Sequence, residues 1–313
     1  MIGRATMLCD LACPSCRAPL AYTAPDRRRC ESCGVTYPCE GGIWRLLSPE
    51  REAALQNFIE EYESVRAAEG RRVDGPEQLL ALPFWHSSPD RRPEWRIRSR
   101  TYAELIRRVV MPLERTRGGP LRILDLGSGL GWLSYRLALR GHKMRAVDLV
   151  INDFDGLGVH HQYPVNFSAV QAEFDRLPFP DASADLVIYN ASFHYSVDFL
   201  STLREGLRVL APPGRLVIMD SPVYHDAASG RAMLRERRDA FERQHNFRGS
   251  ALDGEGFLTF DRLTTLEKRL SLSLAIFVPC YGLRWSLRPW AARLLGRREP
   301  AHFALLVYSR APQ

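Results

Sequence analysis

The chain has 313 residues, of which 45% are hydrophobic and 25% are charged. This is an ordinary globular composition, with enough residues for one large core and a small additional module. No apolar run is long enough to cross a bilayer and the first residues lack the apolar stretch of a signal peptide, so we expect a cytoplasmic protein without membrane contact. The formal net charge of +7 is compatible with binding to nucleic acid. Arginine clusters, however, are more often parts of the solvated surface than binding sites.

Residues 1–46 form the first predicted module, which is rich in cysteine, proline and arginine and shows little helical periodicity. Cys13-Pro-Ser-Cys16 and Cys30-Glu-Ser-Cys33 are two CxxC pairs. Each pair lets two thiolates bind one ion, and two pairs complete a tetrahedral site of four sulfurs. Disulfides are disfavoured in a cytosolic chain, and four unrelated core cysteines would not fall into doublets by chance. We therefore predict a structural Zn²⁺ bound by Cys13, Cys16, Cys30 and Cys33.

Residues 47–117 are predicted to form a helical lid or linker. Ser48 suits the N-cap of a helix that has Pro49 at its first position, and apolar residues then recur at helical spacing as far as Val65. A second amphipathic helix is expected to begin near Glu94. We expect these two helices to cover a binding site together with residues 221–260.

Residues 118–313 show a strand–helix alternation. Strands are expected at 121–126, 144–149, 167–171, 184–190 and 215–220, and helices near 131–140 and 198–210. Further helices are expected near 229–246 and 260–270, and two more strands near 272–278 and 302–308. This alternation predicts a parallel sheet with helices on both faces.

A glycine-rich turn follows the first of these strands. The strand ends in Asp125, and Gly127, Gly129 and Gly131 lead into a helix. Glycines are needed there because a side chain would block a ligand lying against the backbone, and because the turn is expected to adopt positive φ. The turn alone does not decide the ligand, because enzymes that bind dinucleotides use a related one.

Three carboxylates at strand ends narrow the choice of ligand. Asp125 would repel a pyrophosphate, but it suits the ammonium group of a methionine moiety. Asp148, at the end of the next strand, can accept hydrogen bonds from both hydroxyls of a ribose. Glu173 closes the third strand and is followed by Phe174 and the sequence Leu177-Pro-Phe-Pro-Asp181. A nicotinamide enzyme has no role for Asp125 or for the last of these sequences.

The segment from 121 to 220 resembles class I S-adenosylmethionine-dependent methyltransferases, with the enzymes of ubiquinone and menaquinone biosynthesis as the nearest type. The resemblance extends through Asn190-Ala-Ser-Phe-His194-Tyr195 to the strand that ends at Ile218. It implies a Rossmann-like, doubly wound α/β fold with a seven-stranded sheet whose last strand is antiparallel. In that family, the acid at the place of Glu173 meets the adenine amino group and the residue at the place of Phe174 covers the ring. The cofactor-binding residues so implied are Asp125, Gly127, Ser128, Gly129, Gly131, Asp148, Leu149, Glu173, Phe174 and Asn190.

The first module carries a second resemblance. The segment from Cys33 to Leu47, CGVTYPCEGGIWRLL, resembles the zinc ribbon of the small activator proteins of tRNA methyltransferases. It is also similar to the N-terminal ribbons of bacterial ribosomal-RNA guanine methyltransferases. This similarity covers about forty residues and implies a fold rather than a substrate.

Four residues are candidates for catalysis. His194 and Tyr195 come just after the fourth strand, where the transferred methyl group should point, and histidine is the natural proton acceptor near neutral pH. Tyr224 and His225 follow the fifth strand and are expected at the same mouth. For each of them, a purely structural contact is the alternative.

The leading hypothesis is methyl transfer from S-adenosylmethionine to an oxygen, nitrogen or carbon of a small molecule. Such a reaction is an in-line displacement, so the protein mainly aligns the reactants and excludes water. The alternative is an RNA methyltransferase whose zinc ribbon binds ribosomal or transfer RNA. That hypothesis expects Arg27–Arg29 to share one face with Arg71, Arg72, Arg91 and Arg92. A non-catalytic scaffold protein is a third, remote hypothesis, and the sequence predicts no oligomeric state.

Overall fold

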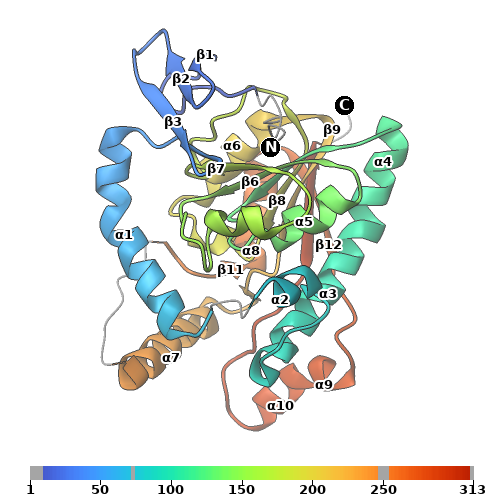
Figure 1. Ribbon diagram of the computed structural model, residues 1–313. Coiled ribbons are helices and arrows are strands. Elements are labelled where there is room, and N and C mark those ends of the chain that lie inside the picture. Colours follow the sequence, from blue (N-terminus) through green and yellow to red (C-terminus); the bar gives the residue numbers. More distant parts are fainter. Residues whose placement is uncertain (1–9, 72–74, 246–253, 311–313) are drawn as a thin grey trace.

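The computed structural model describes residues 10–71, 75–245 and 254–310, and one mixed sheet runs through the molecule (Figure 1). Its strand order is β1-β2-β3-β4-β7-β6-β5-β8-β9-β13-β12. The strands are β1 (Leu20–Ala24), β2 (Arg27–Cys30), β3 (Thr36–Glu40), β4 (Ile43–Arg45), β5 (Arg122–Leu126), β6 (Lys143–Asp148), β7 (Ser168–Gln171), β8 (Ala184–Asn190), β9 (Leu210–Met219), β12 (Leu272–Phe277) and β13 (Leu305–Arg310).

The five central strands confirm the expected fold class. β7, β6, β5, β8 and β9 are parallel to their neighbours, whereas β13 is antiparallel to both β9 and β12. The last strand of the chain is therefore antiparallel, as expected for a Rossmann-like sheet of this type. In such a sheet, ligands bind beyond the carboxyl ends of the parallel strands.

Residues 118–313 contribute seven strands to this sheet, and the four strands of the N-terminal module extend it to eleven. β4 pairs in parallel with β7, with Ile43 opposite Ala169, and β3 pairs antiparallel with β4. The N-terminal module thus continues the sheet. This pairing covers a sheet edge that would otherwise present unpaired backbone groups to solvent.

Two hydrophobic cores lie on the two faces of the sheet, because successive side chains of a strand point to opposite sides. On β5, Leu124 and Leu126 belong to one core and Ile123 belongs to the other. The first core holds residues of the N-terminal module and of α6 and α8, and the second holds residues of α2, α3, α4 and α5. The helices of these layers are α2 (Pro76–Ala81), α3 (Arg92–Leu105), α4 (Met111–Arg117), α5 (Trp132–Leu139), α6 (Phe199–Val209) and α8 (Phe260–Arg269).

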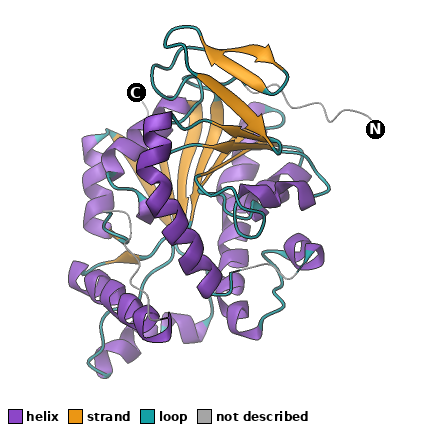
Figure 2. Ribbon diagram, turned by 60° about the vertical axis from the view of Figure 1, so that its left-hand side comes forward, coloured by secondary structure: helices purple, strands orange, loops and turns teal. Residues whose placement is uncertain are grey.

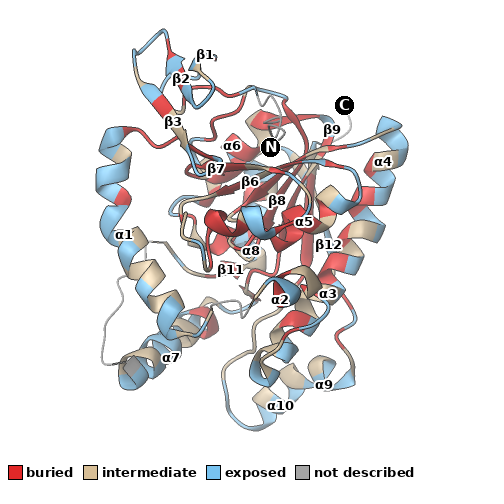
Figure 3. Cartoon of the chain, in the orientation of Figure 1, coloured by how far each residue is buried: buried red, intermediate tan, exposed pale blue. Residues whose placement is uncertain are grey.

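The first helix, α1 (Pro49–Ala68), begins where the sequence predicts it. The Ser48 side chain accepts a hydrogen bond from the Arg51 backbone N–H, and Pro49 occupies the first turn. Leu55 is the only buried residue of α1, so the helix lies on the surface with most of its outer face exposed (Figure 3). Near its C-terminal end, α1 approaches α7 (Ala227–His245) (Figure 1).

The remaining elements lie around the lower edge of the sheet in Figure 1. A two-stranded parallel sheet joins β10 (Val223–Tyr224) to β11 (Leu258–Thr259), and two short helices, α9 (Leu283–Ser286) and α10 (Arg288–Leu294), connect β12 with β13. The N-terminal module projects at the opposite end, as the turned view also shows (Figure 2). Within the described ranges, no helix has both the length and the apolar character required to span a bilayer.

Candidate functional site

The glycine-rich turn between β5 and α5 adopts the backbone conformation that the sequence predicts. Gly127, Gly129 and Gly131 have φ values of +72°, +50° and +75°. A Cβ atom on Gly127 would also clash with the side chain of Ser192. Glycine is therefore required at position 127 both for its backbone freedom and for the space that it leaves.

Asp125 lies behind this turn rather than in the pocket wall. The residue is completely buried, and its Oδ2 accepts a hydrogen bond of 2.8 Å from the Ser134 hydroxyl. Its Oδ1 has no hydrogen-bond partner within the described part of the chain. Burial raises the pKa of this carboxyl to about 7. Any influence of Asp125 on a ligand must therefore pass through the turn above it.

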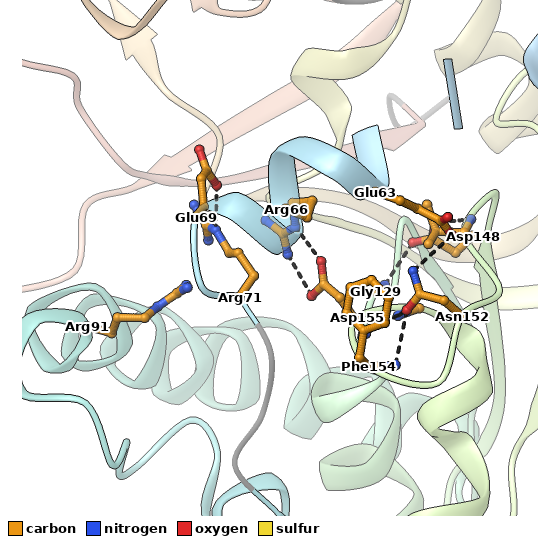
Figure 4. Close-up of polar contacts among 12 residues, drawn as sticks. Glu63, Arg66, Glu69, Arg71, Arg91, Gly129, Asp148, Asn152, Phe154 and Asp155 are labelled. Atoms are coloured by element: carbon orange, nitrogen blue, oxygen red, sulfur yellow. Dashed lines mark hydrogen bonds and ion pairs between the residues drawn. The ribbon is translucent and has the colours of Figure 1, made fainter. Parts of the chain in front are cut away.

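Asp148 holds the turn and the end of β6 together. Its Oδ2 accepts from the Gly129 backbone N–H at 2.8 Å, and its Oδ1 accepts from the Val150 backbone N–H at 2.9 Å (Figure 4). Burial raises the pKa of the carboxyl, and these backbone donors oppose that rise. Asp148 thus lies at the pocket wall with an orientation set by two backbone hydrogen bonds.

The loop after β6 is folded around a single side chain. The Asn152 Oδ1 accepts hydrogen bonds from the backbone N–H groups of Phe154, Asp155 and Gly156 at 3.1, 2.8 and 3.1 Å. This arrangement turns the Asp155 carboxylate toward α1, where it forms a two-point ion pair with Arg66 that includes an Nη2–Oδ1 contact of 2.9 Å (Figure 4).

A second arginine of α1 binds a strand-end carboxylate. Arg51 contacts Glu173 through Nε at 3.0 and 3.2 Å and through Nη2 at 2.5 Å. Arg51 and Arg66 were not among the residues expected from sequence. The available signal was that Arg51, Leu55, Phe58, Tyr62 and Arg66 follow one helical stripe, and all five line the same pocket.

The pocket has a volume of about 670 Å³ and is lined by the strand ends together with α1, α3 and α7. Most of the residues expected from sequence line it. They are Gly127, Ser128, Gly129, Asp148, Leu149, Glu173, Phe174, Asn190, His194, Tyr195 and Tyr224. Asp125, Gly131 and His225 are not part of its wall.

His225 departs from its expected place at the pocket mouth. Its side chain is exposed, and its Nδ1 lies 2.6 Å from Glu299 Oε1, to which His302 Nε2 also comes within 2.8 Å. His225 follows β10, in which both Val223 and Tyr224 are buried, and its backbone N–H also donates to Glu299 at 3.0 Å, so the residue is held toward the surface. In the structure, His225 thus belongs to a surface cluster with Glu299 and His302.

His194 lies in the pocket wall, and its surroundings favour the neutral form of its imidazole ring. Its Nδ1 lies 3.2 Å from the Ser221 hydroxyl. Burial, reinforced by the positive charges of Arg237 and Arg98, lowers the pKa of His194 to about 3. A general base works best with a pKa near the working pH, so His194 is a weak proton acceptor here.

Three residues of the pocket lining carry unsatisfied polar groups. Neither carboxylate oxygen of Asp220 has a hydrogen-bond partner among the described residues, and the same holds for Asn190 Oδ1 and the Tyr224 hydroxyl. Burial raises the pKa of Asp220. Buried polar atoms are rarely left unpaired in proteins, so these groups are ready to bind a ligand. Asp220 was not expected from sequence, although it is one more acid directly after a strand, β9.

An arginine cluster forms another part of the pocket wall, close enough to Asp220 and His194 for its charges to act on their pKa values. Its members are Arg71, Arg91, Arg98, Arg237, Glu69 and Glu94. The three arginines nearest to Glu94 contact it at 2.9 to 3.2 Å. Burial would raise the pKa of Glu94, but these guanidinium groups lower it to about 2. Four cations thus surround two carboxylates. Arg71 and Arg91 lie beyond Arg66, on the side away from Asp148 (Figure 4).

The four cysteines of the N-terminal module converge at one point, far from this pocket. All four sulfurs lie within 4.8 Å of one another, with Cys16–Cys30, Cys13–Cys33 and Cys16–Cys33 separations of 3.4, 3.5 and 3.7 Å. Zn–S bonds of about 2.3 Å in a tetrahedron require sulfur–sulfur distances of about 3.8 Å. The geometry therefore fits a four-sulfur metal site.

Comparisons with known proteins confirm the family expected from the core motifs. Residues 124–218 match the family described as a methyltransferase domain. A malonyl-[acyl-carrier protein] O-methyltransferase of Halorhodospira halophila is 34% identical over 116 residues, which are 36% of this chain and 39% of that protein. A demethylmenaquinone methyltransferase of Thermus thermophilus is 31% identical over 157 residues, which are 47% of this chain and 66% of that protein.

A solved structure shows a similarity that extends over more of the chain. The 1,6-didemethyltoxoflavin-N1-methyltransferase of Burkholderia thailandensis is 14% identical, with a TM-score of 0.48 over 94% of this chain and 99% of that one. The similarity in sequence covers a shorter part of the chain. The match to the Halorhodospira relative spans 39% of the length of that protein.

Proposed function

We propose that this chain, whose core is a class I methyltransferase domain, transfers a methyl group from S-adenosylmethionine to a small-molecule acceptor. One observation carries the proposal. The glycine turn, two strand-end carboxylates and a set of unsatisfied polar groups all line one pocket of about 670 Å³. A cavity of this kind accommodates a cofactor at the strand ends and a small acceptor beside it.

The strand-end residues suit the proposed cofactor. Asp148 is oriented by two backbone donors, which leaves its remaining acceptor capacity for ribose hydroxyls. Glu173 and Phe174 stand where the family resemblance places the adenine contacts, and Arg51 holds the Glu173 carboxylate in position. The bound cofactor supplies a methyl group on a positively charged sulfur. The chain has to orient the acceptor toward that group and exclude water.

The unsatisfied groups of the pocket wall would orient the acceptor. Asn190 and Tyr224 offer an amide oxygen and a hydroxyl without partners among the described residues, and Asp220 offers a carboxylate. The pKa of His194 is lowered to about 3, which makes this ring a weak proton acceptor, whereas burial raises the pKa of Asp220 and makes its carboxylate a stronger proton acceptor than that of an ordinary aspartate. Proton removal is needed only when the acceptor atom is a hydroxyl oxygen or an acidic carbon.

The arginine cluster favours a small anionic acceptor over RNA. Its four guanidinium groups outnumber its two carboxylates, and the cluster borders the pocket, which suits a carboxylate or phosphate group of a small molecule. The arginines of the N-terminal module are at the opposite end of the molecule (Figure 1). There, Arg28 is buried 3.9 Å above the ring of Tyr22. The shared arginine face expected for RNA binding is therefore not found among the described residues, which exclude Arg72.

We also propose that Cys13, Cys16, Cys30 and Cys33 hold a structural Zn²⁺. All four positions of the tetrahedron come from the protein, so the site has no open position for catalysis. The metal would stabilise the strands that extend the sheet beyond β7. This role needs no contact between the ion and the pocket.

Calorimetric titration with S-adenosylmethionine tests the proposal. The wild-type protein should bind the cofactor, and Asp148→Asn should weaken binding by roughly tenfold or more, because a charged acceptor of ribose hydrogen bonds is lost. Asp153→Asn is the matched control, because this carboxylate lies in the neighbouring loop and is 80% exposed. Equal affinities for the two variants would contradict the proposed cofactor site.

The acceptor class needs a second measurement. Purified protein and labelled cofactor are incubated with separate small-molecule and RNA extracts of cells, and incorporation is compared with that of Asp220→Asn. Label in the small-molecule fraction, strongest for anionic compounds, is the expected outcome. Label confined to RNA would refute the proposed acceptor and favour the alternative activity.

A further inference from the structure

Six large apolar side chains stand exposed on the segment between β12 and β13. Their exposed fractions range from 58% to 86%. They are Val278, Leu283, Leu287, Trp290, Leu294 and Leu295, and we call them the apolar patch. Contiguous exposed apolar surface is unusual on a soluble protein and marks an interaction site. The patch has no role in the pocket described above, because none of its members lines that pocket.

The spacing of these residues is that of one helical face. Leu283, Leu287, Trp290 and Leu294 are separated by four, three and four positions, and they belong to α9, α10 and the residue between them. Neither helix contains a buried residue. Both helices project from the lower end of the molecule, and their surfaces are largely exposed (Figure 3).

The charges around the patch have one sign. Between residues 278 and 298 there are five arginines and no aspartate, glutamate or lysine. Arg284, Arg293 and Arg297 are exposed, and their side chains make no hydrogen bond or ion pair with the described residues. The other two are engaged locally, since Arg288 stacks 3.6 Å above the ring of Trp285 and Arg298 pairs with Glu236.

We propose that this segment binds the surface of an anionic lipid bilayer. An interfacial segment combines leucine and tryptophan on one face with arginine around it, so that the apolar side chains enter the boundary between headgroups and acyl chains. The unpaired arginines then meet anionic headgroups. The binding would be peripheral, which departs from the expectation of no membrane contact.

The positive charge around the apolar patch favours an anionic bilayer over a second copy of the chain as its binding partner. Two copies packed through the apolar patch would bring together six exposed arginines, Arg284, Arg293 and Arg297 of each copy, with no acid between residues 278 and 298 to offset them. Repulsion between like charges opposes that arrangement. An anionic bilayer removes the repulsion and buries the apolar face at the same time.

The patch is also connected to the pocket along the chain. Ala301 and Phe303, which follow it, line the pocket, and the Arg288 guanidinium donates to the Ala301 carbonyl oxygen at 2.9 Å. Lipid binding would thus take place close to the pocket wall. The proposal does not require the methyltransferase activity and is tested without it.

Vesicle flotation with the full-length protein provides the test. Vesicles of phosphatidylcholine alone are compared with vesicles that contain about one third phosphatidylglycerol. The wild type should float with the anionic vesicles, show a blue shift of tryptophan emission, and bind neutral vesicles roughly tenfold less. High salt should release part of the protein, because screening weakens the contribution of the arginines.

Two variants separate the apolar and the charged contributions. Trp290→Ser with Leu294→Ser should lower binding roughly tenfold, and Arg284→Gln with Arg293→Gln should abolish the preference for anionic vesicles. All four positions are exposed, and circular dichroism checks that the variants fold. Leu139→Ser is the control, because Leu139 is half-exposed on α5, away from the patch.

Three results would overturn the proposal. The first is no binding to anionic vesicles, and the second is equal binding by the wild type and the serine variant. The third is a stable dimer in light scattering that the serine variant dissociates, because the patch would then be covered by a second copy. A cofactor titration run in parallel keeps this outcome distinct from failure of the proposed enzymatic activity.

Discussion

The ion pair between Arg66 and Asp155 links α1 to the pocket loop, and breaking it should have a large effect. Arg66 is only 19% exposed and Asp155 only 3%, so neither charge is well solvated. Removing one partner of a buried pair leaves an uncompensated charge, which costs about 3–5 kcal/mol. Water reaches the Arg66 side of the pair, so we expect Arg66→Met to lower the free energy of unfolding by the lower figure, about 3 kcal/mol.

A double-mutant cycle measures the coupling between the two residues. Arg66→Met, Asp155→Asn and the double variant are unfolded in urea, and the double variant should lose less stability than the sum of the single changes. We expect a coupling energy of at least about 1 kcal/mol. Hydrogen exchange should also become faster in α1, because Leu55 is its only fully buried residue.

The matched control is the exposed pair of Arg262 and Glu255, in which both side chains are 46% exposed. Arg262→Met with Glu255→Gln should show a coupling of at most about 0.5 kcal/mol, as is usual for surface pairs. Additive effects of the Arg66 and Asp155 changes, within about 0.5 kcal/mol, would refute the idea that this pair holds α1 on the pocket.

Three further outcomes are expected. Gly127→Ala should lower the melting temperature and abolish cofactor binding in calorimetry, because φ is +72° at this position and the new Cβ would clash with a neighbouring side chain; unchanged binding would contradict this. Because the pKa of Asp125 is about 7 in the folded protein and about 3.9 in an unfolded chain, the folded state binds more protons between these values. Stability from this group is therefore present at low pH and is lost as the pH rises from about 4 to about 7; urea unfolding across that range should show a smaller decline for Asp125→Asn. Cys33→Ser should abolish zinc binding measured by elemental analysis and lower the melting temperature, and full zinc content in that variant would exclude the four-sulfur site.

Local patterns in the sequence were sufficient to predict the core of the fold. Short apolar runs predicted β5, β6 and β8, and helical periodicity predicted α5 and α6, because each pattern is contained within one element. The positive φ values at Gly127, Gly129 and Gly131 are a property of the turn itself. Since parallel strands end at the same edge of a sheet, the chain order also implied that Asp148 and Glu173 would lie near one another.

The features that the sequence did not predict depend on contacts between distant segments. Arg51 and Glu173 are 122 positions apart in the sequence, and Arg66 and Asp155 are 89 positions apart. The helical spacing of residues in α1 does not indicate which surface the helix will pack against. Nothing local distinguishes Tyr224, which is buried, from His225, which turns to Glu299. For such residues, side-chain direction is set by the packing of elements around them.

The sequence by itself therefore determined the strand–helix order, the glycine turn and the acids at the strand ends, because these follow from covalent neighbours and backbone preferences. Only the tertiary structure decided that β4 extends the sheet at β7, that α1 closes the pocket with Arg51 and Arg66, and that Asp220 faces the cavity. The physical reason is that burial, ion pairing and edge-strand pairing are properties of surfaces brought together by folding. Their partners are chosen by the shape of the whole chain rather than by adjacent residues.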